Sequence, residues 1–117
     1  SALDGLARKL SLDPRFVKIR DRDLAEGQHR NDTNRADYFT TAFFHRPEDL
    51  RSELEVAGFR DVAVLGVEGP GWVLSDFDSR WEDAALRKDI LDVAKSLEAE
   101  PSILAVSAHL LAVGRKL

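Results

Sequence analysis

The sequence contains no cysteine and no methionine. Without cysteine the chain has no disulfide bond, no thiolate metal ligand and no cysteine nucleophile. Its longest apolar run, Ile103 to Val113, is interrupted by Ser107 and His109 and is far shorter than the roughly 20 residues of a membrane-spanning helix. The amino terminus also lacks the basic and apolar regions of a signal peptide. We therefore expect a cytoplasmic protein with no membrane partner.

The sequence also lacks an excess of positive charge. It has 17 Lys and Arg against 21 Asp and Glu, which gives a formal net charge of -4 at pH 7. Because domains that bind nucleic acid collect Lys and Arg on one face, we expect no nucleic acid partner. Its 44% hydrophobic and 32% charged residues are typical of folded proteins, and 117 residues suit a single unit with one core.

The first part of the chain is predicted to be helical. Apolar residues within Leu3–Leu10 recur at i, i+3, i+4 and i+7, which is the spacing of a short amphipathic helix. A second helix is expected to start with Asp13 as its N-cap and Pro14 as its first residue, and to end near Gly27. Its predicted apolar anchors are Phe16, Val17 and Leu24.

The chain changes character between the second helix and His45. The run Gln28–Asp37 is polar and rich in turn-forming residues, so we predict an exposed loop. The next segment, Tyr38–Phe44, contains four of the nine aromatic residues and predicts an extended segment that leads to His45.

The most informative stretch is Arg46–Leu65. Pro47 suits the first position of a helix, two acidic residues follow it at the positive end of the helix dipole, and Gly58 suits the left-handed residue that ends the helix. The segment Val62–Val67 is apolar at every position except its glycine, which predicts a strand covered on both faces, as in a parallel sheet. This stretch therefore predicts one helix-to-strand unit of a larger α/β sheet.

The remainder of the chain predicts a turn, a long helix and a last strand. The two glycines and the proline of Glu68–Trp72 favour a tight turn. Ser79–Glu82 matches a capping box at the start of the helix, and Pro101 closes the helical region. Ile103–Val113 is predicted to form the final strand. The predicted buried stripe of the long helix consists of Leu86, Ile90, Val93, Ala94 and Leu97.

Taken in order, these elements resemble the carboxy-terminal portion of class I S-adenosylmethionine-dependent methyltransferases, which have a Rossmann-like α/β sheet. The resemblance is carried by the helix after Pro47, the Ala57-Gly58-Phe59 junction, the valine-rich strand, and the phrases Tyr38–Thr41 and Ser107–Val113. In that family the chain after the fifth strand carries an insertion over the active site, a helix, the sixth strand, and an antiparallel seventh strand beside the fifth.

The resemblance implies a role for each part of the chain. Residues 1–45 correspond to the helical cover on the substrate side, and 46–117 to the last α/β unit. Within that unit, 46–57 correspond to the helix, 60–67 to the sixth strand, 69–101 to a helical connection and about 104–115 to the seventh strand. The resemblance implies a protein that methylates a small molecule with S-adenosyl-L-methionine as its cofactor. Separately, the richness of the sequence in arginine and alanine favours a bacterium of high genomic GC content as its source.

The glycine-rich loop with which this family binds its cofactor is not present in these residues. We therefore expect no cofactor-binding residue here and no catalysis by this chain alone. A sheet of so few strands is incomplete as a stand-alone unit, so the expected partner is the missing amino-terminal half of a parent protein or a second copy of the chain. The alternative is a self-contained α+β interaction or ligand-binding module that dimerises through exposed strands. A regulatory relative that has lost catalysis is a third possibility.

The candidate site residues follow from the rule that ligands lie beyond the carboxyl ends of parallel strands. His45 is the candidate catalytic base because imidazole titrates near neutral pH, with helix capping or packing as its alternative role. The candidate substrate-binding residues are His29, Tyr38, Phe43, Glu68 and Trp72. The alternatives are a surface position for His29, core packing for the aromatic residues and helix capping for Glu68, while Trp72 is expected to act as a lid. His109 is expected to be a hydrogen-bonded core residue, and the spacing of the three histidines predicts no metal site.

Overall fold

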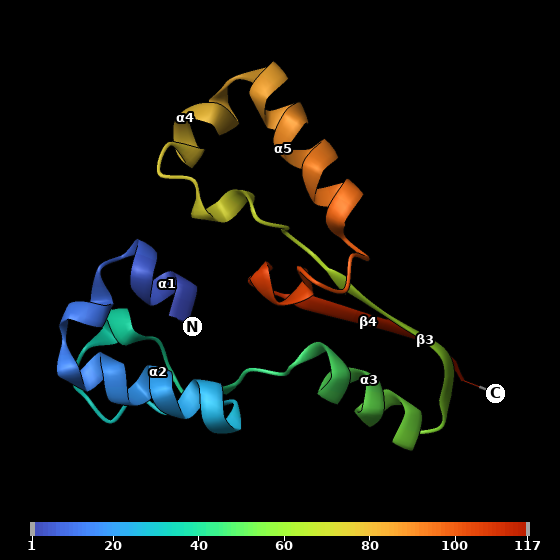
Figure 1. The fold of residues 1–117 in the computed structure, drawn as a ribbon, viewed down its shortest axis with the longest axis horizontal. Coiled ribbons are helices and arrows are strands. Elements are labelled where there is room, and N and C mark those ends of the chain that lie inside the picture. Colours follow the sequence, from blue (N-terminus) through green and yellow to red (C-terminus); the bar gives the residue numbers. More distant parts are fainter. Residues whose placement is uncertain (1, 117) are drawn as a thin grey trace. The chain divides into compact units, whose positions relative to one another are not determined.

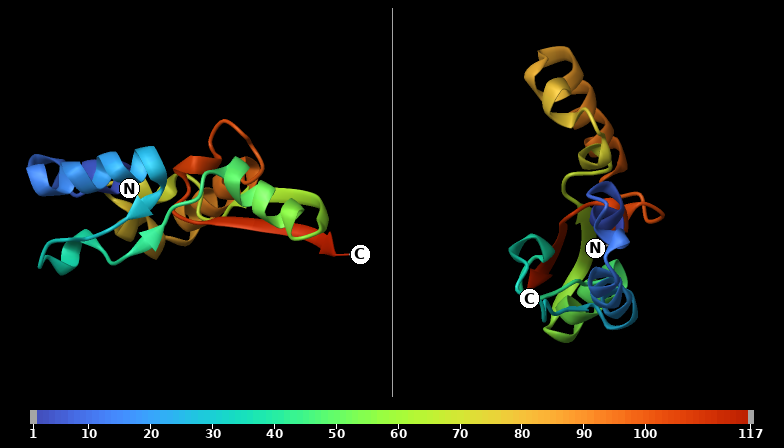
Figure 2. Two further views of the ribbon diagram at one scale, coloured as in Figure 1. Left: turned by 90° about the horizontal axis from the view of Figure 1, so that it is seen from below. Right: turned by 90° about the vertical axis from the view of Figure 1, so that its left-hand side faces the viewer.

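The computed structural model describes residues 2–116 and forms two compact units, Ser1–His45 and Arg46–Leu117. The described residues contain five α-helices and two sheets, each of two antiparallel strands (Figures 1 and 2). The fold is therefore mixed α/β, as expected. None of the helices in this part of the chain is long and apolar enough to cross a membrane.

The first unit starts with α1 (Ala2–Ala7), a 3-10 turn (Leu10–Leu12) and α2 (Pro14–Glu26). The prediction for α2 is confirmed at both ends. The Asp13 carboxylate accepts a hydrogen bond from the Arg15 amide, Pro14 takes the first position, and Gly27 ends the helix with φ of 72°. The unit then adds β1 (Gln28–His29), a 3-10 turn (Ala36–Tyr38) and β2 (Ala42–Phe43).

The core of the first unit consists of Phe16, Ile19 and Tyr38, with Leu10 packed against it. The rings of Phe16 and Tyr38 meet edge to face, with 5.3 Å between their centroids. The prediction that Leu24 anchors α2 is wrong, because its side chain is exposed and Ile19 is buried instead. Phe16, another predicted anchor, is buried as expected.

The second unit is built on α3 (Pro47–Val56) and the strands β3 (Phe59–Gly66) and β4 (Leu110–Lys116). Gly58, with φ of 88°, joins α3 to β3 as predicted. The helix packs against both strands (Figure 1), and the Arg51 guanidinium donates a hydrogen bond to the Val62 carbonyl. The last strand was expected from Ile103, but Leu104–Val106 forms a 3-10 turn and the strand begins only at Leu110.

The two long strands are antiparallel and contain a bulge. Arg60 pairs with Arg115 and Ala63 with Val113, so Asp61 and Val62 together lie opposite Gly114. Asp61 adopts a positive φ of 52°, which accommodates the extra residue.

Only one face of this hairpin is covered. Val62 and Val64 are buried, whereas the opposite face carries Leu65, Leu111 and Val113, and the last two are 50% and 52% exposed. Within the described residues the hairpin therefore has cover on one face only, and the expected cover of the second face stays a prediction. A run of apolar residues has no alternation of apolar and polar positions, so the sequence does not show which face of the strand is uncovered.

Between the strands lie a 3-10 turn (Gly71–Val73), α4 (Phe77–Glu82) and α5 (Ala84–Leu97). The predicted capping box is wrong. Ser79 lies inside α4, and Asp83 caps α5 by accepting hydrogen bonds from the Ala85 and Leu86 amides at 2.9 Å. The predicted buried stripe of α5 is wrong for Leu86 and Val93, which are exposed. Ile90, Ala94 and Leu97 are half-buried, and the helix has no fully buried residue.

Candidate functional site

The carboxyl end of β3 and the start of β4 bring Glu68 and His109 together. One carboxylate oxygen of Glu68 accepts the His109 backbone N–H at 2.9 Å, and the other is hydrogen-bonded to Nδ1 of the His109 ring. The last strand pair is Gly66 with Leu110, so the antiparallel register continues directly to these residues. The fold thereby joins two side chains that lie 41 positions apart in the sequence.

Three further hydrogen bonds fasten the turn after β3 to the segment before β4. The Val67 amide donates to the His109 carbonyl at 3.0 Å, and the Gly69 amide donates to the Ser107 hydroxyl at 2.9 Å. The Trp72 indole Nε1 donates to the Val106 carbonyl at 2.8 Å. The Trp72 side chain is half-buried, and its hydrogen bond ties the indole ring to the backbone. We expected this residue to act as a lid, and this bond restricts its movement.

The environment of Glu68 favours its ionised form. Partial burial raises the pKa of this carboxyl, but the hydrogen bonds from the His109 ring and amide lower it by more, so the pKa lies below its usual value. The carboxylate therefore holds the Nδ1 side of the imidazole.

The other side of the His109 ring is open. Its side chain is 77% exposed, and no described residue bonds to its Nε2. The prediction of a core histidine is therefore wrong. A carboxylate behind an exposed imidazole is an arrangement that can accept a proton from a ligand at Nε2.

His29, expected at the surface of a polar loop, is only 1% exposed, and that expectation is wrong. Its Nδ1 lies 2.9 and 3.0 Å from the two carboxylate oxygens of Asp23, and its Nε2 donates to the Tyr38 carbonyl at 2.8 Å. The rings of Phe39 and Phe44 meet its edges. Since both ring nitrogens are engaged within the protein, His29 positions the chain around it and has no nitrogen left for a substrate.

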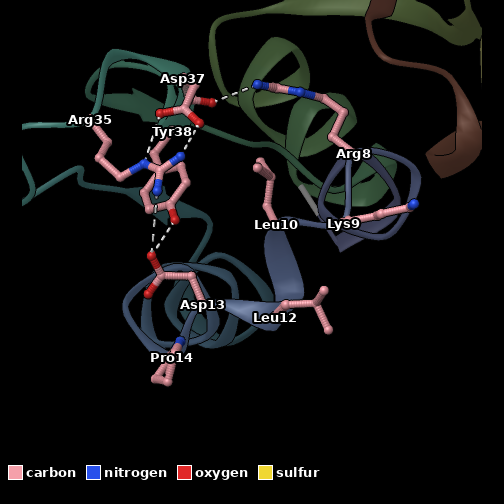
Figure 3. Close-up of a pocket in the computed structure, with 9 residues that line it drawn as sticks. All are labelled: Arg8, Lys9, Leu10, Leu12, Asp13, Pro14, Arg35, Asp37 and Tyr38. Atoms are coloured by element: carbon pink, nitrogen blue, oxygen red, sulfur yellow. Dashed lines mark hydrogen bonds and ion pairs between the residues drawn. The ribbon is translucent and has the colours of Figure 1, made fainter.

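Tyr38 belongs to the core of the first unit, and its hydroxyl donates to the Asp13 carboxylate at the edge of an open pocket of about 580 Å³ (Figure 3). The Arg15 guanidinium and the Tyr38 hydroxyl hold the pKa of Asp13 well below its usual range. The contact with Asp13 in turn raises the pKa of Tyr38.

The two arginines of this pocket are each paired with a carboxylate, Arg8 with Asp4 at 3.1 Å and Arg35 with Asp37. Arg35 forms a fork on the Asp37 carboxylate at 2.7 and 3.0 Å, and Arg8 donates to the Asp37 carbonyl at 2.9 Å (Figure 3). We therefore assign no anionic ligand to the pocket.

His45 and Phe43 form a second local pair. The Phe43 ring is half exposed and meets the His45 ring edge to face at 4.8 Å. Arg46 caps α3 without a side-chain hydrogen bond, and the contact of His45 with Phe43 is the packing that was one alternative role for His45. The catalytic role of His45 and the substrate contact of Phe43 stay predictions.

The sequence-predicted residues thus fall into two groups. His29, Tyr38, Phe43 and His45 belong to the first unit, while Glu68 and Trp72 belong to the second. Asp23 and the pairing of Glu68 with His109 were not predicted from the sequence. The pairing could have been inferred only from the antiparallel register of the last strand with β3.

Within residues 2–116, no group of three or more histidine, aspartate or glutamate side chains is arranged to hold a metal ion. No protein-family model, curated protein or solved structure matches the chain.

Proposed function

We propose that this chain is the carboxy-terminal, substrate-covering portion of an S-adenosylmethionine-dependent methyltransferase that acts on a small molecule in the bacterial cytoplasm. The order of elements supports the proposal. Helix α3, strand β3, the helices α4 and α5, and the antiparallel strand β4 follow one another as the last elements of a Rossmann-like methyltransferase do.

The observation that carries the proposal is the incomplete hairpin of β3 and β4. Within the described residues each strand has one neighbour only, and the face with Leu65, Leu111 and Val113 is uncovered. Strands with apolar residues on both faces belong to sheets with helices on both sides. In the proposed parent protein, the fifth strand would pair with the free edge of β4, and helices of the preceding chain would cover the open face.

The proposal also gives a role to Glu68 and His109. Methyl transfer is an in-line displacement that requires an oriented acceptor, exclusion of water and, for some acceptors, removal of a proton. His109 lies beyond the carboxyl end of β3, on the side where α/β sheets bind ligands, and Glu68 orients its ring. His109 is therefore the stronger base candidate in this unit, and His45 is a second candidate in the other.

Calorimetric titration with S-adenosylmethionine tests the proposal on the 117-residue chain and on the longer natural protein that would contain it. We expect binding by the longer protein alone, because the chain lacks the glycine-rich loop. A longer protein that fails to bind the cofactor would refute the proposal.

The free strand edges also favour a second candidate, a self-contained module that dimerises through β3 and β4. Sedimentation of the 117-residue chain tests it, with Val113→Lys as the variant that places a charge on the open face. A dimer that dissociates in this variant, together with a longer protein that does not bind S-adenosylmethionine, would favour the module over the methyltransferase.

A further inference from the structure

Phe39 has two unfavourable properties at once. Its ring is 58% exposed, and its backbone adopts φ of 69° and ψ of -174°. This region is occupied almost only by glycine, and such backbone strain costs on the order of 1 to 3 kcal/mol and persists where the surroundings enforce it. A strained and exposed aromatic residue therefore needs an explanation other than core packing.

One side chain enforces this conformation. The Asn31 amide donates to the carbonyl of Arg35 at 2.7 Å and to the carbonyl of Phe39 at 2.8 Å. Its own oxygen accepts hydrogen bonds from the amide and hydroxyl of Thr33. Asn31 thus clamps both ends of the 3-10 turn Ala36–Tyr38 and holds Phe39 directly after it.

The ring of Phe39 is supported from behind. It meets the edge of the buried His29 ring at 5.9 Å and lies nearly parallel to the Phe44 ring at 6.5 Å, with 25° between the planes. Because Asp23 and Tyr38 fix His29, the support is rigid. The rest of the ring remains open to a ligand.

The open part of the ring borders a hollow of about 510 Å³, which is within the size range of small-molecule sites. No ionisable residue lines it: the lining residues are Asn31, Ala36, Phe39, Thr40 and Thr41. No described residue hydrogen-bonds to the hydroxyls of Thr40 and Thr41. The hollow therefore combines one aromatic surface with free neutral hydrogen-bonding groups.

We propose that this hollow binds an uncharged, flat aromatic molecule that stacks on Phe39 and hydrogen-bonds through a polar substituent to Thr40 or Thr41. The identification of this ligand as the methyl acceptor rests on the proposed function, whereas the binding site itself does not.

The test is an NMR titration of the 117-residue chain with 2-naphthol, an aromatic ring system that carries one hydroxyl. We expect saturable shifts of the Thr40 and Thr41 amides, and much weaker shifts with cyclohexanol, which has the hydroxyl but no flat ring. Phe39→Ala should weaken 2-naphthol binding about tenfold, as expected for the loss of an aromatic contact. Leu12→Ala removes an exposed apolar side chain of the same unit that lies outside the hollow, and this variant should leave binding unchanged.

Phe39→Gly separates a binding role from a structural one. Glycine adopts this backbone region without strain, so the variant should melt at the same or a higher temperature than the wild type while it loses the affinity for 2-naphthol. No saturable binding by the wild type would overturn the proposal, and so would equal binding by Phe39→Gly. Since no cofactor is present in this titration, its result is independent of the test with S-adenosylmethionine.

Discussion

Replacement of His29 by alanine should destabilise the first unit severely. The imidazole is almost fully buried, and it satisfies the Asp23 carboxylate, whose side chain is 5% exposed, as well as the Tyr38 carbonyl. Leaving a buried acceptor without its hydrogen-bond donor costs about 1 to 3 kcal/mol per group, because the acceptor stays in a poorly solvated position. The total stability of a small domain is only about 5 to 15 kcal/mol, so this single change should remove a large share of it.

Urea unfolding followed by the NMR signals of residues 14–45 measures this effect separately from the second unit. The double variant Asp23→Leu with His29→Leu should recover most of the loss, since replacing both partners of a buried hydrogen bond by apolar groups of similar shape can be nearly neutral. Lys88→Ala, which breaks the exposed pair of Lys88 and Asp92, serves as the control and should leave the midpoint unchanged. A loss below about 1 kcal/mol for His29→Ala would refute the reasoning, because that is the range of an exposed pair.

Three further predictions concern the second unit. The pKa of Glu68 lies below its ordinary value of 4.5, so its pairing with His109 stabilises the fold above that pH and the contribution is lost as the pH falls through the lowered pKa. The melting temperature of Glu68→Gln should therefore fall less between pH 6 and pH 3 than that of the wild type. An equal fall in both proteins would argue against the pairing. Asp83→Ala should lower the free energy of unfolding in urea by about 1 kcal/mol and Ser79→Ala by less than about 0.5 kcal/mol, because only Asp83 caps α5. Equal losses would support the predicted capping box at Ser79. Gly58→Ala should cost about 1 to 2 kcal/mol because of its positive φ, although no atom lies within 4 Å of the added methyl, and a neutral effect would contradict the strain argument.

The parts of the fold that could be predicted are those whose signals are local. The ends of α2 are determined by Asp13, Pro14 and Gly27, which lie next to the turns they stabilise. The junction at Gly58 is predictable for the same reason. In contrast, the start of α5 was predicted from a capping box at Ser79, whereas the Asp83 carboxylate accepts hydrogen bonds from the two amides of the first turn.

The arrangement of the candidate site depends on contacts between residues that are separated in the sequence, and local patterns do not predict such contacts. The polarity of the loop suggested that His29 is exposed, but a hydrogen bond from its ring to Tyr38 and the Asp23 carboxylate allow the imidazole to be buried. Glu68 and His109 meet only because β4 runs antiparallel to β3. A local pattern cannot reveal such pairs before the strand register is known.

The bulge at Asp61 has a consequence for how this strand can evolve. Phe59 and Val64 are separated by an odd number of positions, yet their partners Lys116 and Ala112 place them on the same side of the hairpin. Deletion of Asp61 would exchange the sides of Phe59 and Arg60, so that an aromatic ring would turn towards water and a guanidinium towards α3. Related chains should therefore conserve the number of residues in this strand more strictly than the residue type at position 61.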